Sequence, residues 1–276
     1  MKPDSPKEYW RGVAADFGSA DAIGFAPVLH PTAPFWFNEQ IDQLQFRAVL
    51  RALGVAQIVS GAKVLDVGCG TGRWVRRFQA LGLKPTGLDA TPEMLRLASR
   101  RGTNACLLSA EAHRLPLADQ TFDCVTDITV VQHIPPELQP VAIAEMLRVL
   151  RPGGSLVLME LIRGHGTHIF PRKPEDWIRQ ATNKGARLID WFGQEYLILD
   201  RTFVRLALAL LGLTRGADAG AAPTTPGSTV GRPSLARHIF WGIRRVTVPV
   251  SVRAEPIAAK FCSSGFATHG VFVFRK

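Results

Sequence analysis

The chain has 276 residues, 46% of them hydrophobic, and a formal net charge of +10 at pH 7. This length fits one large α/β domain, or one domain with an insert, and the apolar share is sufficient for a buried core. No apolar run reaches the roughly 18–20 residues that a membrane span needs, and the opening residues MKPDSPKEYW lack the apolar region of a signal peptide. The four cysteines show no framework spacing, so we expect reduced thiols and a cytoplasmic protein.

The first 55 residues are predicted to form a cap in front of the main fold. Residues 1–38 are rich in Pro, Gly and aromatic side chains, which predicts irregular structure. Residues 39–53 follow a helical pattern instead, because apolar residues recur there with spacings of three and four. These residues are Phe46, Val49, Leu50 and Leu53.

The most informative stretch is VLDVGCGTGR, residues 64–73. A short apolar run ends in an acid and glycines follow, which predicts a strand, a tight turn and the start of a helix. Gly68, Gly70 and Gly72 allow positive φ angles and leave no Cβ in the way of a nucleotide-sized ligand. A dinucleotide fingerprint would place the third glycine one residue later, and a phosphate-binding P-loop would need Gly-Lys-Ser/Thr. Neither pattern is present here.

Strand and helix patterns alternate beyond this turn, which predicts a doubly wound, mostly parallel sheet in a single α/β domain over 1–276. The expected strands are 63–67, 85–88, 105–108, 123–127, 155–160 and 186–192. The expected helices are 72–81, one that starts at Pro92 behind the N-cap Thr91, 137–150 and 175–183.

The positive charge is concentrated in one stretch of the chain. Residues 201–260 hold nine Lys or Arg and two Asp or Glu, a net of +7, which leaves +3 for the other 216 residues. We expect 197–262 to be an insert, with a flexible, almost uncharged part at 217–231 and a basic amphipathic helix at 234–248. Its cations could be solvated, could contact an acidic or lipid-linked acceptor at a membrane face, or could bind nucleic acid.

Four further segments extend the pattern around the glycine turn. They are PTGLD ending at Asp89, SAEAHRLPLADQTFDCVTDI at 109–128, EMLRVLRPGGSLVLMEL at 145–161, and THGVFVFRK at 268–276. In this order they resemble the class I S-adenosylmethionine-dependent methyltransferases, and most of all the ubiquinone/menaquinone-type small-molecule enzymes. The resemblance implies a seven-stranded sheet of order 3-2-1-4-5-7-6 with strand 7 antiparallel. The insert would then form a helical lid between strands 6 and 7.

The resemblance also implies where S-adenosylmethionine would bind and S-adenosylhomocysteine would remain. Asp89 would accept both ribose hydroxyls through charge-assisted hydrogen bonds, and Asp66 and Gly68 would line the methionine end. Ser109 stands where the family usually has Asp, so the adenine partner stays open between Ser109, Glu111 and a backbone carbonyl. The expected cofactor residues are Trp36, Arg47, Asp66, Gly68, Cys69, Gly70, Thr71, Gly72, Arg73, Asp89, Ala90, Ser109, Ala110, Glu111, Asp127 and Ile128.

Methyl transfer is a direct displacement, so the protein mainly aligns the reacting groups, and a general base helps when a hydroxyl or an amine is methylated. His133 follows strand 4, where the family often has histidine, and His165 follows strand 5. Either residue could be that base, or could merely pack near the site. His165 and His168 have the spacing of a metal pair, but no further ligand lies at a suitable distance in the sequence, so we expect no metal.

We expect a small-molecule, glycan or lipid-linked acceptor and O- or N-methylation. An RNA or DNA methyltransferase is the alternative that the net charge favours, but the end of strand 4 lacks [DNS]-P-P-[YF] and the chain has no Pro-Cys pair. A non-catalytic cofactor-fold module is a third alternative, and the complete glycine turn argues against it. The location would be cytoplasmic, with peripheral membrane contact through the insert as one alternative. The oligomeric state stays open.

Overall fold

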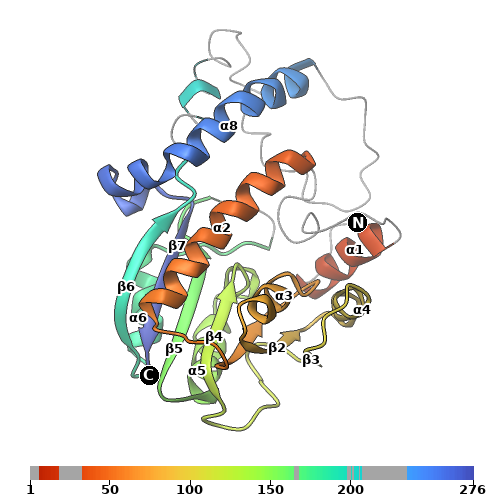
Figure 1. Ribbon diagram of the computed structural model, residues 1–276, viewed down its shortest axis with the longest axis vertical. Coiled ribbons are helices and arrows are strands. Elements are labelled where there is room, and N and C mark those ends of the chain that lie inside the picture. The colour runs from red at the N-terminus through yellow and green to blue at the C-terminus, as the bar shows by residue number, and fades with distance from the viewer. Residues whose placement is uncertain are drawn as a thin grey trace.

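The computed structural model describes residues 6–18, 33–164, 168–197, 200, 202–204, 206 and 235–276. Its centre is a seven-stranded sheet of order β3-β2-β1-β4-β5-β7-β6 (Figure 1). The strands are β1 Lys63–Val67, β2 Lys84–Asp89, β3 Cys106–Ser109, β4 Phe122–Ile128, β5 Leu150–Leu161, β6 Arg187–Gln194 and β7 His269–Arg275. Only β7 runs antiparallel to its neighbours β5 and β6. The predicted strand order and direction are confirmed.

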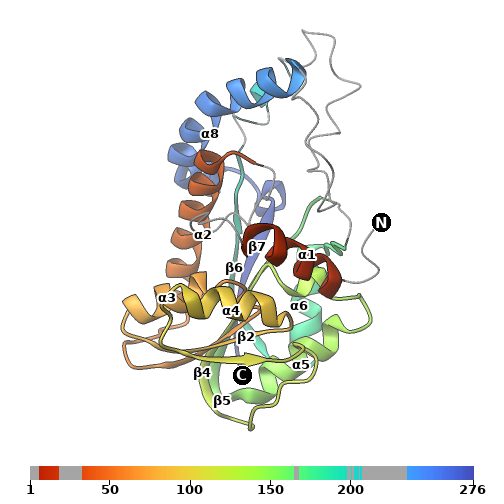
Figure 2. The same cartoon turned by 90° about the vertical axis from the view of Figure 1, so that its right-hand side faces the viewer.

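Helices cover both faces of the sheet (Figure 2). They are α1 Pro6–Gly18, α2 Phe35–Val55, α3 Arg73–Ala80, α4 Pro92–Arg100, α5 Gln139–Val149, α6 Pro174–Thr182 and α8 Leu235–Phe261, with short 3₁₀ turns η2 Val131–His133 and η4 Ser264–Phe266. Alternate strand residues face opposite sides. Val64 therefore packs with α2 and α3, whereas Leu65 packs with α5 and α6.

Two segments depart from the predicted secondary structure. Residues 1–38 were expected to be irregular, but α1 is a helix, because Tyr9, Trp10 and Val13 pack against Met94 of α4. The basic helix extends to Phe261, well beyond the expected end at residue 248, and includes two prolines. Neither proline can donate a backbone hydrogen bond, and the residues on both sides of the first one, Val248 and Val252, pack with α2. The expected flexible part of the insert lies outside the described residues.

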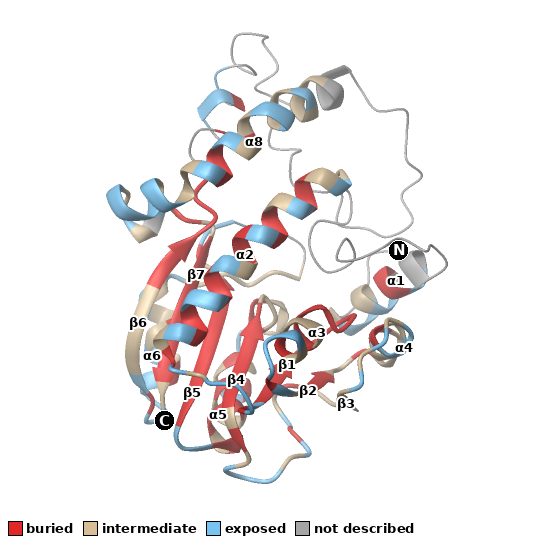
Figure 3. Cartoon of the chain, viewed as in Figure 1, coloured by how far each residue is buried: buried red, intermediate tan, exposed pale blue. Residues whose placement is uncertain are grey.

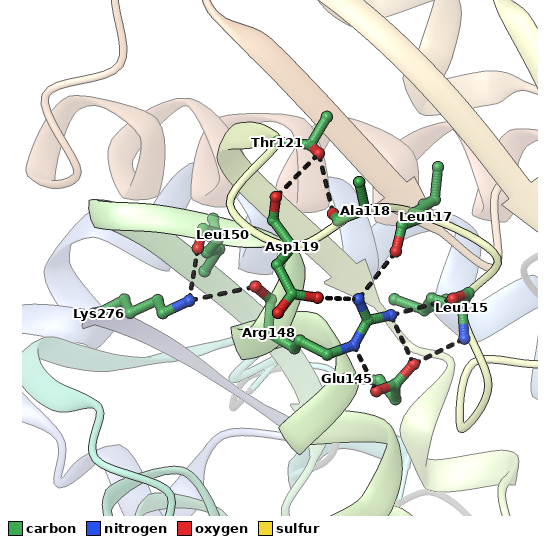
Figure 4. A network of polar contacts seen from close by, with 9 residues as sticks. All are labelled: Leu115, Leu117, Ala118, Asp119, Thr121, Glu145, Arg148, Leu150 and Lys276. Atoms are coloured by element: carbon green, nitrogen blue, oxygen red, sulfur yellow. Dashed lines mark hydrogen bonds and ion pairs between the residues drawn. The ribbon is translucent and has the colours of Figure 1, made fainter.

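Arg148 on α5 anchors the loop between β3 and β4 (Figure 4). Its guanidinium donates to both carboxylate oxygens of Glu145 and to Asp119 Oδ1 at 2.5 Å. It also donates to the carbonyl oxygens of Leu115 and Leu117, at 3.0 and 2.8 Å. The planar guanidinium carries several N–H donors and can satisfy several acceptors at once. Arg148 therefore fixes the path of the loop that leads from the carboxyl end of β3 to the start of β4.

Arg148→Met should destabilise the fold by about 1–3 kcal/mol, because it leaves two backbone carbonyls and Glu145 without their charged donor. Urea unfolding followed by circular dichroism would measure the loss. The control is Arg179→Met, which removes an exposed pair with Asp176 and should cost less than about 1 kcal/mol. Equal losses in the two variants would contradict an anchoring role for Arg148.

Candidate functional site

The glycine turn follows β1 and has the backbone that the sequence predicts. Gly68, Gly70 and Gly72 have φ angles of +67°, +53° and +72°, a region that side-chain-bearing residues rarely adopt. A Cβ on Gly68 would lie 2.3 Å from Val130 Cγ2. The turn therefore requires glycine for its shape and, at position 68, also for the close approach of the loop after β4.

Asp89, the last residue of β2, braces this turn. Its Oδ2 accepts a hydrogen bond from Gly70 N at 2.8 Å, and its Oδ1 accepts one from Thr91 N, also at 2.8 Å, at the start of α4. Burial raises the pKa of Asp89, while these two donors oppose that shift. Each carboxylate oxygen keeps acceptor capacity for a further donor, which is what a ribose edge would supply.

Two buried polar atoms beside the turn lack a partner among the described residues. Asp66 accepts from Thr126 Oγ1 at 2.9 Å through one oxygen, but its Oδ2 is unpaired, and so is Thr71 Oγ1. Burial raises the pKa of Asp66 to about 7. Buried polar atoms without a partner are costly, so this pair fits a site that is completed by a polar ligand.

The adenine side of the expected site lies next to Asp89. Ser109 pairs in register with Asp89 across β2 and β3, and Ala110 N donates to the Asp89 carbonyl at 3.1 Å. Glu111 forms an ion pair with Lys7 of α1, with 3.4 Å between Nζ and Oε1. Cys69 is buried within the turn and its backbone N donates to Leu88 O at 2.9 Å.

Other expected cofactor residues are engaged elsewhere. Arg73 donates to Asp42 Oδ1 at 2.7 Å and to Gln45 Oε1 at 2.9 Å, so its guanidinium joins α3 to α2. Burial lowers its pKa, and Asp42 opposes that shift. Trp36 packs edge-on against Trp241 of α8, and Arg47 is exposed on α2. These positions favour structural roles for Arg73 and Trp36.

A buried carboxyl pair lies beneath the loop that follows β4. Glu160 of β5 accepts backbone hydrogen bonds from Val130 and Val131 at 3.0 Å and from Gln132 at 2.9 Å. Burial and the nearby carboxyl raise the pKa of Glu160, and burial raises the pKa of Asp127 to about 7. The sequence analysis missed Glu160, although an acid within the apolar run LVLMEL is a signal that could have indicated it.

The same loop presents His133 beneath α1. His133 Nδ1 donates to the His168 carbonyl at 3.0 Å, so Nδ1 carries the proton. The His133 ring packs in a T-shaped arrangement with Trp10 at a centroid distance of 5.2 Å. Burial lowers the pKa of His133 to about 4. The ring is thus neutral at physiological pH, and its Nε2 accepts a long hydrogen bond from Gln132 Nε2 at 3.4 Å. His165, the other expected base, lies outside the described residues.

Within the described ranges, no three His, Cys, Asp or Glu side chains gather in a way that could hold a metal ion. In the same part of the chain, no helix is both long enough and apolar enough to cross a bilayer.

Residues 64–154 match a family model described as a methyltransferase domain. Over 114 residues the chain is 36% identical to a malonyl-[acyl-carrier protein] O-methyltransferase of Serratia marcescens and 38% identical to a demethylmenaquinone methyltransferase of Renibacterium salmoninarum. Each match covers 41% of this chain, with 44% of the first relative and 46% of the second, so the chain spans less than half the length of these curated relatives.

A solved structure shares the fold over nearly the whole chain. It is a chain of the complex between the Haloferax volcanii Trm112 methyltransferase activator and the putative methyltransferase, with a TM-score of 0.56, 13% identity and 96% coverage of both chains. The structural likeness and the strand order show the class I methyltransferase fold, and residues 64–154, which include the glycine turn, match the methyltransferase domain family.

The Asp127–Glu160 pair should make stability depend on pH. The pKa of Asp127 is raised from its ordinary value near 4 to about 7 in the folded state, so the folded protein binds the proton more tightly than the unfolded chain. The contribution of Asp127 to the free energy of unfolding is fully present below about pH 4. It is lost as pH rises from about 4 to about 7, by up to about 1.4 kcal/mol per pH unit.

Asp127→Asn cannot titrate and should lack this loss. Urea unfolding of both proteins at several pH values would therefore show the variant gaining stability relative to the wild type up to about pH 7, and a constant difference above it. If the difference in unfolding free energy between the two proteins did not depend on pH, the raised pKa of Asp127 would be contradicted. His133 has a lowered pKa, so its own effect on stability has the opposite dependence on pH. This effect is common to both proteins and cancels when their unfolding free energies are subtracted.

Proposed function

We propose that this chain transfers a methyl group from S-adenosylmethionine to the oxygen or nitrogen of a small-molecule, glycan or lipid-linked acceptor. The observation that carries the proposal is the Asp89 carboxylate held against the glycine turn through Gly70 N, next to the unpaired buried oxygens of Asp66 and Thr71. This arrangement fits a polar, nucleoside-sized ligand. When bound, the cofactor supplies an electrophilic methyl group on a sulfonium.

The residues of the turn would hold the cofactor along its length. Asp89 would accept the ribose hydroxyls, since its two oxygens retain acceptor capacity. Gly68 and Asp66 would border the methionine end, and the Ser109–Glu111 segment would border the adenine. Asp66 has a pKa near 7, so it could hold the methionine end either as an acceptor or, when protonated, as a donor.

The protein's contribution to the reaction would be alignment and exclusion of water. α1 lies over the loop after β4, with Trp10 against His133 and Tyr9 near His168. His133 is neutral at physiological pH, and its Nδ1 proton is held by the His168 carbonyl. The long contact from Gln132 Nε2 to His133 Nε2, at 3.4 Å, would have to give way before Nε2 accepts the proton of a hydroxyl or an amine.

The curated relatives support a small acceptor or one attached to a carrier. Their names specify demethylmenaquinone and malonyl-[acyl-carrier protein]. We therefore propose malonyl-[acyl-carrier protein], the acceptor of a relative named as an O-methyltransferase, as the first acceptor to test, beside a small-molecule extract of the host and its RNA. Demethylmenaquinone belongs in the same assay, and methylation of its ring carbon would contradict transfer to oxygen or nitrogen. Label transferred from S-[methyl-³H]adenosylmethionine to RNA alone would favour the nucleic-acid alternative instead.

S-Adenosylhomocysteine should raise the melting temperature of the protein. A ligand that binds only the folded state at about 100 times its Kd adds about 2.7 kcal/mol, which corresponds to about 5–10 °C for a domain of this size. Asp89→Ala should abolish the rise, because the ribose loses its carboxylate. The control is Asp190→Ala on β6, where the acid pairs with exposed Arg51, and it should keep the full rise.

A wild-type protein with no shift at millimolar ligand would overturn the proposed function. A shift that survives Asp89→Ala would leave the cofactor in place and refute the assigned ribose contact. If Asp89→Ala does not fold, Asp89→Asn keeps an acceptor for Gly70 N while it removes the charge, and the same comparison applies.

His133→Asn should slow methyl transfer to an acceptor identified in this way by about 100-fold or more. The KM for S-adenosylmethionine and the thermal shift with S-adenosylhomocysteine should stay unchanged, because His133 is assigned to the acceptor. Steady-state kinetics with the labelled cofactor would separate these parameters. An unchanged kcat would mean that His133 only packs against Trp10.

A further inference from the structure

α8 has two different faces. One face packs onto the fold, where Val248 and Val252 are buried with residues of α2, and Arg244 forms an ion pair with Asp200 at 2.8 Å. Glu255 on the same side accepts hydrogen bonds from the backbone N of Glu195 and Tyr196, at 2.6 and 3.2 Å, just beyond the end of β6. This face fastens α8 across the carboxyl edge of the sheet.

The opposite face of α8 exposes a row of large apolar side chains. Val246, Val250, Ile257 and Phe261 are 69%, 48%, 63% and 77% exposed. Their spacings of four, seven and four residues bring them to one side of a helix. Single exposed apolar residues are ordinary, whereas a contiguous apolar row is typical of a binding surface. Figure 3 shows this exposure over the C-terminal turns of α8.

Cations accompany the apolar row, and acids are absent from it. Arg253 and Lys260 are exposed and lie seven and fourteen residues after Val246, so they share its side of the helix, and exposed Arg245 borders it. Glu255 is the single acid of α8, and it is bonded on the buried face. The outer face therefore presents apolar and positively charged groups together, with no negative charge of its own.

We propose that this outer face of α8, formed by Arg245, Val246, Val250, Arg253, Ile257, Lys260 and Phe261, binds the surface of an anionic lipid bilayer. A helix with this pattern lies in the plane of the interface, its apolar row among the upper acyl carbons and its long cations at the lipid phosphates. The charge excess of the whole 201–260 stretch acts in the same direction.

Docking through this face would hold the cofactor edge of the sheet near the bilayer. α8 lies beyond the carboxyl end of β6 (Figure 1), and Asp89 and the loop after β4 lie at the carboxyl ends of β2 and β4 in the same sheet. An acceptor with an apolar anchor could then reach the site without leaving the membrane. This consequence rests on the proposed function, but the binding itself does not, because α8 shares no residue with the glycine turn.

The test is co-sedimentation of the full chain with vesicles of phosphatidylcholine alone and of phosphatidylcholine with phosphatidylglycerol. We expect binding to the anionic vesicles, little binding to the neutral ones, and weaker binding as salt rises. Arg253→Glu with Lys260→Glu should weaken the anionic binding about tenfold or more. The control is Lys84→Glu with Lys184→Glu, two exposed lysines outside α8, which makes the same change in net charge and should bind like the wild type.

Ile257→Ser with Phe261→Ser should also weaken binding, because it removes the apolar half of the surface while the charge stays constant. Circular dichroism would check that each variant is folded. Equal binding of the two double charge variants would overturn the proposal, since only net charge would then matter. A dimer in sedimentation experiments that Ile257→Ser with Phe261→Ser dissociates would overturn it in favour of a second copy of this chain. The S-adenosylhomocysteine shift, measured without vesicles, reports separately on the proposed function.

Discussion

Asp89 joins the glycine turn to the start of α4 through two 2.8 Å hydrogen bonds, from Gly70 N and Thr91 N. The backbone donors of a tight turn and of a helix start both need acceptors, and one carboxylate satisfies both. The turn after β1 and the start of α4 are thereby held together at the same edge of the sheet. The proposed ligand would use the acceptor capacity that these backbone bonds leave on Asp89, so the same side chain would have both a structural and a binding role.

Carboxyl groups that are buried or half-buried attach the remaining elements to this edge. Asp42 of α2 receives both Arg73 and Arg77 of α3, Glu160 holds the loop that bears His133, and Glu255 holds α8 over the end of β6. Such groups stay buried only when their partners are correctly placed. Each contact therefore restricts where its helix or loop can lie, and together they enclose the site.

The glycine turn, Asp89 and the alternation of strands and helices could be predicted because their signals are local: glycines at a tight turn, an acid at a strand end, and alternating periods of two and 3.6 residues. The order of the strands in the sheet was implied by the family resemblance and not by these local signals. α1 could not be predicted in this way. Its helix depends on Trp10 and neighbouring side chains packing on α4, about 80 residues further along the sequence. The hydrogen-bond partners of Arg73 could not be predicted for the same reason, because they lie on α2, about 30 residues earlier in the sequence.

By itself, the sequence determined the class of fold, the cofactor turn and the basic character of the segment before β7. These depend on backbone conformation and on composition, which neighbouring residues largely set. Only the tertiary structure decided that Glu160 supports the His133 loop, that Trp36 packs on α8, and which side of α8 remains exposed. Those outcomes depend on burial and on partners distant in the chain, because the cost of a buried charge or an exposed apolar row is set by what surrounds it.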